Sequence, residues 1–451
     1  MIASVSARLA SFLLAGDVTG DVLHEAKRLV LNQLKASVAA TGHPAIRILH
    51  DWATADTGGQ GGAHIHWFGT QTTPQQAAMF NGALYEVLDF HDTYIPCFMH
   101  AVSAVLPAVF ALAERRGSSG KAFLTALARG VEAELVIATI LMPTGYYRGY
   151  VPAGLTGGVG AAAACAVLAG LDAERTQAAL GIAMCTAFGL YVSVGSNTLP
   201  YISGAAARSG LSAFELAERG FTAPPTAFEG DKGMFVTHSD EDAGKIDAVL
   251  ATFGDDWRLF SQTYKVVPTE TITHGPIECV LAVLPRAAGR TVDRLVFKVC
   301  PIVQSIADER RDRLGPPNSV SEATFDLRYC AAAAWQRGRF TTAETAADVY
   351  TAPDVLALRD RVDLVADPGR PTFDGCSLDV RYSDGSTDFH NVDHFLGTPG
   401  ARVPDDMLAA LLRQYATGVL PDGRADAIAD AVWGLDAAPD LTGLVALLRM
   451  D

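Results

Sequence analysis

Apolar residues recur at helical spacing along roughly the first 265 residues of the chain. Gly117, Gly170 and Gly220 each follow an apolar run and are expected to end a helix, and Asp172 is expected to cap the next one. Strand-like alternation of useful length is missing from this part of the sequence. The pattern therefore predicts helices over residues 22–40, 76–90, 100–116, 120–141, 157–170, 173–193 and 203–219.

The pattern changes after about residue 268, where apolar and polar positions begin to alternate. Strands are expected in TVDRLVFKVCPIV, at the start of SEATFDLRYCAAAA, in VDLVAD and in CSLDVRYSDGSTDFHNV, where SDG signals a turn. Helical spacing lies between these segments and returns at the carboxyl end. We predict a mainly α fold, with a large all-helical domain, 1–267, completed by 403–451, and a smaller α+β lid domain, 268–402.

Composition supports a well-buried globular protein, because 49% of the residues are hydrophobic and only 19% are charged. The net charge of −15 argues against a nucleic-acid partner, which requires clustered Lys and Arg. Segments 149–171 and 176–207 carry no charge and are long enough to raise the question of a membrane span. Their Gly, Ala, Ser and Thr content, broken by Pro152 and Pro200, favours close-packed buried helices. No membrane partner is therefore expected.

The cysteines and the glycine motif argue against several kinds of site. The seven cysteines are scattered without a CxxC pair, which favours reduced thiols in a cytoplasm over disulfides or a zinc site. GVGAAA at 158–163 fits GxGxxA, but no strand precedes it and no acidic residue lies about twenty positions on. A dinucleotide site is not expected there.

The densest polar cluster is LDFHDTYIPCFMH, at residues 88–100. Asp89, Asp92 and Thr93 lie three and four positions apart, so we expect them to share a helix face. His100 follows after a proline. The group can supply a general base, a general acid and an anchor. The alternative is structural: Asp89 caps a helix, Asp92 pairs with an Arg, and His100 is a satisfied core histidine.

A second cluster, TYKVVPTETITHGPIECV, lies at the border between the two predicted domains. Lys265 in an apolar cleft can act as a base, or it can clamp a carboxylate as a cation. The structural alternative is a surface lysine followed by a histidine, His274, that begins a helix.

Several motifs, in this order, resemble the MmgE/PrpD family: FNGALYEVLDFHDTY, HAVSAVLPAVFALAERRGSSGKAFLTAL, GYVPAGLTGGVGAAAACAVLAGLD and YKVVPTETITHGPIE. The family includes 2-methylcitrate dehydratase, cis-aconitate decarboxylase and iminodisuccinate epimerase. The resemblance covers most of the chain. It implies a helical domain with a smaller lid, an active site between the two, a homodimer, and no metal or organic cofactor.

The resemblance also implies which residues act. Asp89 and Thr93 match the acidic motif of the family, and His100 matches the histidine that follows it, with one extra residue between. Lys265 matches the lysine of the Y-K-x-x-P stretch, and His274 matches the histidine after it.

The chain departs from the family pattern at four positions. Val151 replaces a histidine, Leu199 and Ile202 stand where relatives often have a lysine and a histidine, and His91 stands where an Asp is common. Because a tricarboxylate needs several cationic contacts to offset its desolvation, we expect a smaller or more apolar substrate. Tyr146, Tyr147 or Tyr150 can replace the lost donor near Val151.

We therefore expect a lyase or isomerase that removes a proton beside the carboxylate or carbonyl of a small organic acid. His100 would be the acid or base, Lys265 would stabilise the enolate or bind a carboxylate, and Asp89 and Thr93 would orient His100 or bind a hydroxyl. Asp92, His274, Tyr147 and Tyr150 are the remaining expected substrate contacts. Two alternatives stay open: a binding protein that has kept the fold without the activity, and a magnesium-dependent enzyme that uses Asp89 and Asp92.

Overall fold

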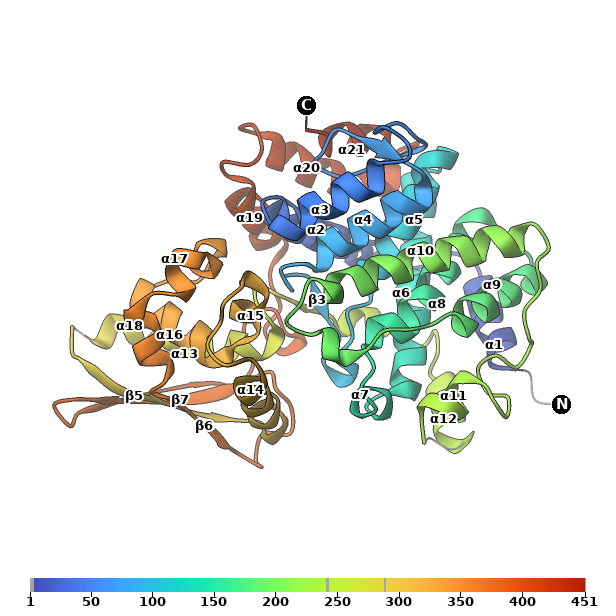
Figure 1. Ribbon diagram of the computed structural model, residues 1–451. Helices are drawn as coiled ribbons and strands as arrows, with labels where there is room; N and C mark the ends of the chain where they lie inside the picture. Colours follow the sequence, from blue (N-terminus) through green and yellow to red (C-terminus); the bar gives the residue numbers. More distant parts are fainter. Residues whose placement is uncertain (1–3, 241–242, 288, 451) are drawn as a thin grey trace. The chain divides into compact units, whose positions relative to one another are not determined.

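The computed structural model describes residues 4–240, 243–287 and 289–450. The chain is mainly helical (60%), with a small mixed four-stranded sheet in the carboxyl-terminal region, which confirms the predicted fold class (Figure 1). Two compact units divide it. The first comprises residues 1–87, 91–262 and 404–451, and the second comprises residues 88–90 and 263–403.

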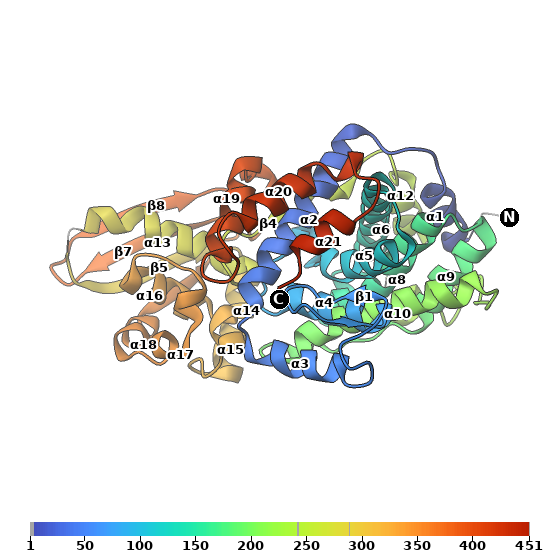
Figure 2. The same ribbon diagram turned by 90° about the horizontal axis from the view of Figure 1, so that it is seen from above.

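The first unit is a helical body. Its helices are α1 Val5–Leu13, α2 Gly20–Ala40, α3 Pro44–Thr54, α4 Pro74–Glu86, α5 Val102–Arg116, α6 Gly120–Leu141, α7 Thr144–Tyr147, α8 Pro152–Ala169, α9 Ala173–Cys185, α10 Thr198–Glu218, α11 Met234–His238, α12 Ala243–Ala251, α19 Asp405–Ala416, α20 Arg424–Trp433 and α21 Thr442–Leu447. Short strands β1 Ala63–His64, β2 Gln71–Thr72 and β3 Asp92–Thr93 lie between them. Figure 2 shows α8 at the centre of the body, beside α5, α6 and α10.

Small residues allow these central helices to pack backbone against backbone. A Cβ atom added to Gly204 of α10 would lie 2.1 Å from the carbonyl oxygen of Met79 in α4, and one added to Gly210 would lie 2.4 Å from that of Gly158 in α8. Among the described residues, α8 is the one helix long and apolar enough to cross a membrane, and 83% of it is buried. That burial is typical of a core helix, as the small-residue content of 149–171 predicts.

Several predicted helix ends are correct. The Asp172 side chain accepts a hydrogen bond from the Arg175 amide (2.8 Å) and caps α9, while Gly117 and Gly170 end their helices with φ of 61° and 65°. Two helices end earlier than predicted. Helix α4 stops at Glu86 rather than 90, and α9 stops at Cys185 rather than 193.

The second unit contains the sheet, in the order β6-β5-β7-β8. Its elements are α13 His274–Ala287, β5 Val292–Val299, α14 Pro301–Leu314, α15 Val320–Phe325, α16 Leu327–Arg337, α17 Ala347–Tyr350, α18 Pro353–Arg359, β6 Val362–Ala366, β7 Cys376–Tyr382 and β8 Thr387–Val392, with the short strand β4 Thr263–Tyr264 before them. Strand β5 pairs in parallel with β6 and antiparallel with β7, and β7 and β8 form the hairpin that SDG predicted. Helices α13 and α16 cover one face of the sheet (Figure 1).

One predicted strand is wrong. SEATFDLRYC forms helices α15 and α16 instead, because Ser319 and Asp326 each cap a helix by accepting a hydrogen bond from the amides of Glu322 and Tyr329. Phe325, Leu327 and Tyr329 occupy alternate positions, as in a strand, and all three are buried. Buried helices can show the same alternation, so the pattern does not distinguish the two structures.

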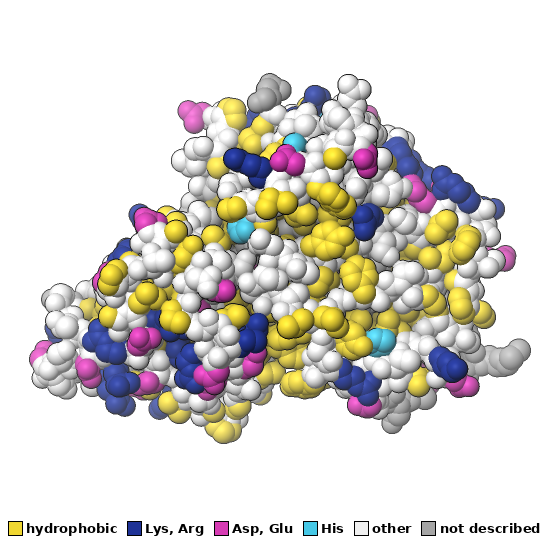
Figure 3. Space-filling model, in the orientation of Figure 1, with side chains coloured by type: hydrophobic (Ala, Val, Ile, Leu, Met, Phe, Trp, Pro, Cys, Tyr) yellow, Lys and Arg dark blue, Asp and Glu magenta, His cyan; other side chains and the backbone are white. Residues whose placement is uncertain are grey.

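The helical body also exposes apolar side chains. Hydrophobic residues gather on the face over α10 in the space-filling view (Figure 3). Ile48 and Trp52 of α3, and Leu190 and Val192 before α10, are all more than 45% exposed. Such a surface is available for contact with another protein chain.

Candidate active site

The segment between α4 and α5 does not have the helical geometry that its spacing predicted. Helix α4 ends at Glu86, Asp89 adopts a left-handed conformation with φ of 47°, and Asp92 and Thr93 form strand β3. The prediction that Asp89, Asp92 and Thr93 share a helix face is therefore wrong. Residues 88–90 pack with the second unit, whereas His91 onward belongs to the helical body.

His100 is positioned by a tight turn. The backbones of Tyr94 and Met99 exchange two hydrogen bonds (2.8 and 3.2 Å), and Phe98 has a left-handed φ of 52°. The His100 Nδ1 lies 2.8 Å from the carbonyl oxygen of Asp92 and 3.3 Å from the Thr93 hydroxyl. Because a carbonyl oxygen only accepts, Nδ1 carries the proton and Nε2 carries the lone pair.

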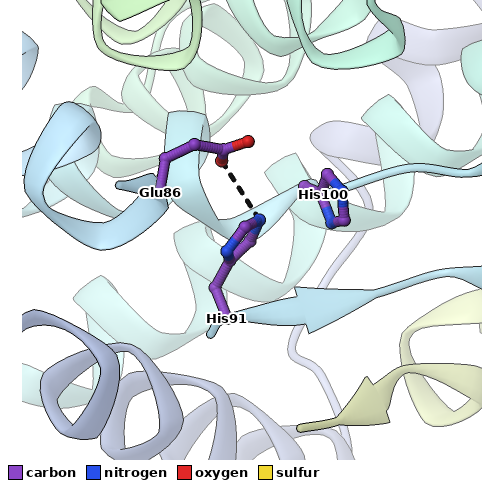
Figure 4. A group of neighbouring side chains, drawn as sticks. All are labelled: Glu86, His91 and His100. Carbon is purple, nitrogen blue, oxygen red and sulfur yellow. Dashed lines mark ion pairs between the residues drawn. The ribbon is translucent and has the colours of Figure 1, made fainter. Parts of the chain in front are cut away.

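A second imidazole and a carboxylate lie beside His100. His91 Nε2 forms an ion pair with Glu86 Oε2 at 3.1 Å, and the His91 and His100 ring centroids are 4.3 Å apart at 64°. Glu86 projects from the last turn of α4 toward His91, with His100 alongside (Figure 4). His91 is fully buried and Glu86 is 5% exposed, so these groups interact in a region of low dielectric constant.

Two further carboxyl groups face this region. Asp92 accepts a hydrogen bond from the Gln33 side chain of α2 at 2.6 Å. Glu134 of α6 is buried and lies 3.3 Å from the Thr156 hydroxyl. Burial, followed by the nearby carboxyls of Asp92 and Glu86, raises the pKa of Glu134 well above its ordinary value.

Two glycines of α8, Gly157 just before the GVGAAA motif and Gly160 within it, make room for Glu134. A Cβ added to Gly160 would lie 2.5 Å from Glu134 Oε2, and one added to Gly157 would lie 3.4 Å from Oε1. The motif therefore serves helix packing within α8 rather than the binding of a dinucleotide phosphate.

In the second unit, Lys265 and Asp89 form a buried ion pair. The Lys265 ammonium donates to the Asp89 carbonyl oxygen at 2.7 Å and to the Asp89 carboxylate, and its side chain is fully buried. Glu270, paired with Arg310, lies in the same charged group. Burial raises the pKa of Glu270, and Arg310 opposes that rise. Lys265 is thus the buried partner of Asp89 rather than a surface lysine.

The other predicted contacts are more dispersed. His274 begins α13 and is buried in the second unit, with its ring 5.3 Å from that of Phe395. Tyr147 is 67% exposed, and the Tyr150 ring lies 4.7 Å from that of His238. A neighbouring residue, Tyr146, reaches the turn that carries His100.

Tyr146 approaches that turn through its ring, which lies 5.0 Å from the ring of Phe98. Its hydroxyl donates to the hydroxyl of Tyr191 at 3.0 Å, which fixes the ring from the other side of the chain. Tyr146 of GYYRGY therefore contacts the segment leading to His100.

The three aliphatic residues that depart from the family pattern, Val151, Leu199 and Ile202, lie in an apolar part of the helical body. Val151 and Ile202 are 5% and 4% exposed. The Ile202 side chain comes so close to Gly154 and Gly189 that a Cβ atom on either glycine would lie 2.9 Å from it. Leu199 is half-buried on the same helix, α10. These positions provide hydrophobic surface and no charge.

Sequence reasoning missed Gln33, Glu86 and Glu134 as members of this group. Each is a polar residue on a largely buried helix, and each is itself buried in the structure. A polar residue on a helix that is otherwise expected to be buried is the signal that could have identified them.

Comparison with protein-family models gives two matches. The MmgE/PrpD N-terminal domain matches residues 7–246, and the MmgE/PrpD C-terminal domain matches residues 267–436. The chain belongs to the MmgE/PrpD family. Its members are lyases such as cis-aconitate decarboxylase and 2-methylcitrate dehydratase.

Curated relatives of this MmgE/PrpD protein are distant but match over almost the whole length. A cis-aconitate decarboxylase-like protein of Aspergillus oryzae is 25% identical, over 96% of this chain and 94% of its own. The cis-aconitate decarboxylase of Aspergillus terreus is 26% identical, over 98% and 94%, and that of Mus musculus is 25% identical, over 96% and 90%.

Proposed function

We propose that this MmgE/PrpD protein is a cofactor-independent lyase or isomerase that abstracts a proton beside the carboxylate or carbonyl of a small organic acid. The observation that carries the proposal is the His100 imidazole, whose Nδ1 is fixed on the Asp92 carbonyl so that Nε2 can accept a proton. Thr93 lies at the same ring and can orient it or bind a substrate hydroxyl.

Lys265 supplies the complementary charge in this proposal. A buried ammonium is already in place when negative charge develops on an enolate, so the protein does not have to rearrange around the transition state. The same ammonium can instead bind a substrate carboxylate. Asp89 holds the ammonium in place through its carboxylate and its carbonyl oxygen. In a dehydration the enolate expels a hydroxyl group, and in an epimerisation it is reprotonated on its other face. In a decarboxylation the enolate forms when the carboxylate is lost. Dehydration, epimerisation and decarboxylation thus share one intermediate.

The substrate that we propose carries fewer charges than a tricarboxylate. Val151 and Ile202 are buried aliphatic side chains at positions where the family resemblance leads us to expect cationic or polar groups. A carboxylate placed against such a surface would lose hydration without compensation. A mono- or dicarboxylic acid with an apolar portion suits these positions better. The names of the relatives make decarboxylation of an unsaturated acid one of the reactions to test first.

The test is proton NMR in deuterated buffer with a panel of hydroxy, imino and unsaturated carboxylic acids. We expect deuterium to enter the position beside the carboxylate, or a new vinyl signal to form, with the wild-type protein. Saturation-transfer measurements on the same samples report binding separately. Exchange on none of the acids, together with clear binding of one, would instead favour the second candidate, a binding protein that has kept the fold.

The loss of charge at Val151, Leu199 and Ile202 is the observation that favours this second candidate. Against it stands the retention of the Lys265–Asp89 pair and of the oriented His100, because a buried ion pair is costly to maintain where it serves no purpose.

A further inference from the structure

Glu86, His91 and His100 form a compact group of metal-binding side chains within the helical body. One carboxylate oxygen and one nitrogen of each imidazole all lie within 4.8 Å of one another (Figure 4). The Glu86 and His91 atoms are already 3.1 Å apart. Neither the family models nor the names of the relatives assign a metal to these residues.

The distances suit a tetrahedral cation after a small movement. Zinc lies about 2.0–2.2 Å from histidine nitrogen and carboxylate oxygen, so neighbouring ligand atoms are about 3.4 Å apart. Glu86 and His91 satisfy this separation, and His100 needs to approach by about 1.4 Å at most. His100 is the least buried of the three, so its ring has the most room to make this approach.

The surroundings suit a divalent charge. Glu86 on α4, Asp92 on β3 and Glu134 on α6 bring three carboxyl groups to the region, and Glu134 interacts electrostatically with both of the others. The bond from His100 Nδ1 to the Asp92 carbonyl is also the outer-shell contact that commonly orients a metal-binding histidine.

Ligand type selects the ion. Two imidazoles and one carboxylate favour zinc and similar transition-metal ions over magnesium or calcium, which prefer oxygen ligands alone. Magnesium binding by Asp89 and Asp92 on one helix face, the alternative left open by the sequence, loses its geometric basis because that helix face does not exist.

We propose that Glu86, His91 and His100 bind a zinc-like divalent cation, and that the bound ion inhibits the enzyme. A neutral imidazole has a single ring lone pair, so a metal ion on His100 occupies the lone pair that would otherwise accept the substrate proton. Binding of the ion stands on the geometry alone, whereas inhibition also rests on the proposed function.

Binding is tested by calorimetric titration of chelator-treated protein with zinc chloride, and by the visible absorption of the cobalt-substituted protein. We expect about one ion per chain, with affinity reduced roughly tenfold or more in the His91→Asn and Glu86→Gln variants. His64→Asn is the matched control, because His64 forms an ion pair with Glu114 in the same body but lies outside the group. Melting curves in chelator identify variants that fail to fold.

Each outcome decides the proposal. Equal zinc affinity in wild type, His91→Asn and His64→Asn would overturn the site. Inhibition is tested by proton exchange with and without zinc: wild-type exchange should fall and recover with chelator, while residual exchange in His91→Asn should not respond. Activation by zinc would overturn the inhibitory role and assign the ion to catalysis. If no substrate shows exchange, the proposed function fails while the binding result still stands.

Discussion

At the scale of single residues, the site depends on charges held out of water. The Lys265 ammonium is fully buried, and the Asp89 carboxylate that binds it is 6% exposed. Asp89 also requires a left-handed backbone, which Asp and Asn tolerate better than most residues. The same residue therefore serves as an ion-pair partner and as the point where the chain turns away from α4.

Replacing Lys265 by Met should lower the free energy of unfolding by about 3–5 kcal/mol, because Asp89 would be left as an uncompensated buried charge. Adding Asp89→Asn should restore part of the loss while preserving the left-handed turn. Urea unfolding followed by circular dichroism measures both effects, with Lys232→Met, at an exposed lysine, as the control. A loss no larger than that of the control would mean that the pair contributes nothing to stability.

At the scale of elements, glycine placement decides how closely α8 can pack. Gly160 faces Glu134 of α6, whereas a Cβ atom on Gly158 would meet nothing closer than 3.6 Å. The two glycines lie two positions apart in one helix, so a change to alanine gains the same helix propensity at both positions. Only the surroundings of the new methyl group differ.

Gly160→Ala should therefore destabilise the protein by about 1–3 kcal/mol, because the new methyl group would overlap Glu134 and Val105. Gly158→Ala should be neutral or stabilising by up to about 1 kcal/mol, since alanine favours the helix and the site has room. Thermal melting of the two variants beside the wild type makes the comparison. Equal effects would contradict the packing described for α8.

Elements that depend on local signals could be predicted from the sequence, whereas elements that depend on contacts between distant residues could not. Apolar spacing and caps such as Asp172 are local, and they located most helices and the β7–β8 hairpin. The extended backbone at Asp92 is held by hydrogen bonds with Gln33, which lies far away in the sequence, and with His100, which lies across a turn. Residue spacing alone could not reveal them.

The candidate site was predictable to a similar degree. The stretch around His100 and the charged Lys265 stand out because charged residues make up only 19% of this sequence. Their partners do not, since Glu86 on α4 and Glu134 on α6 come within electrostatic reach of each other only in the folded body. The wrong helix face for Asp89 and Asp92 shows the limit of a periodicity argument in a segment that contains a turn.

At the scale of the whole molecule, the family resemblance predicts a homodimer. Light scattering should give a particle mass of twice the 47.6 kDa of one chain. The exposed apolar side chains of α3 and of the segment before α10 are consistent with such an association. A mass of one chain at micromolar concentration would contradict this prediction and leave the apolar surface for another partner.

The central claim is that His100 removes a substrate proton, and the most direct test compares deuterium incorporation by wild type and His100→Ala. His50→Ala, at a histidine on α3, serves as the control. We expect the initial rate of incorporation to fall by roughly 10²–10⁴-fold in His100→Ala and to remain unchanged in the control. Full exchange by a folded His100→Ala variant would contradict the account and assign the proton transfer to another residue.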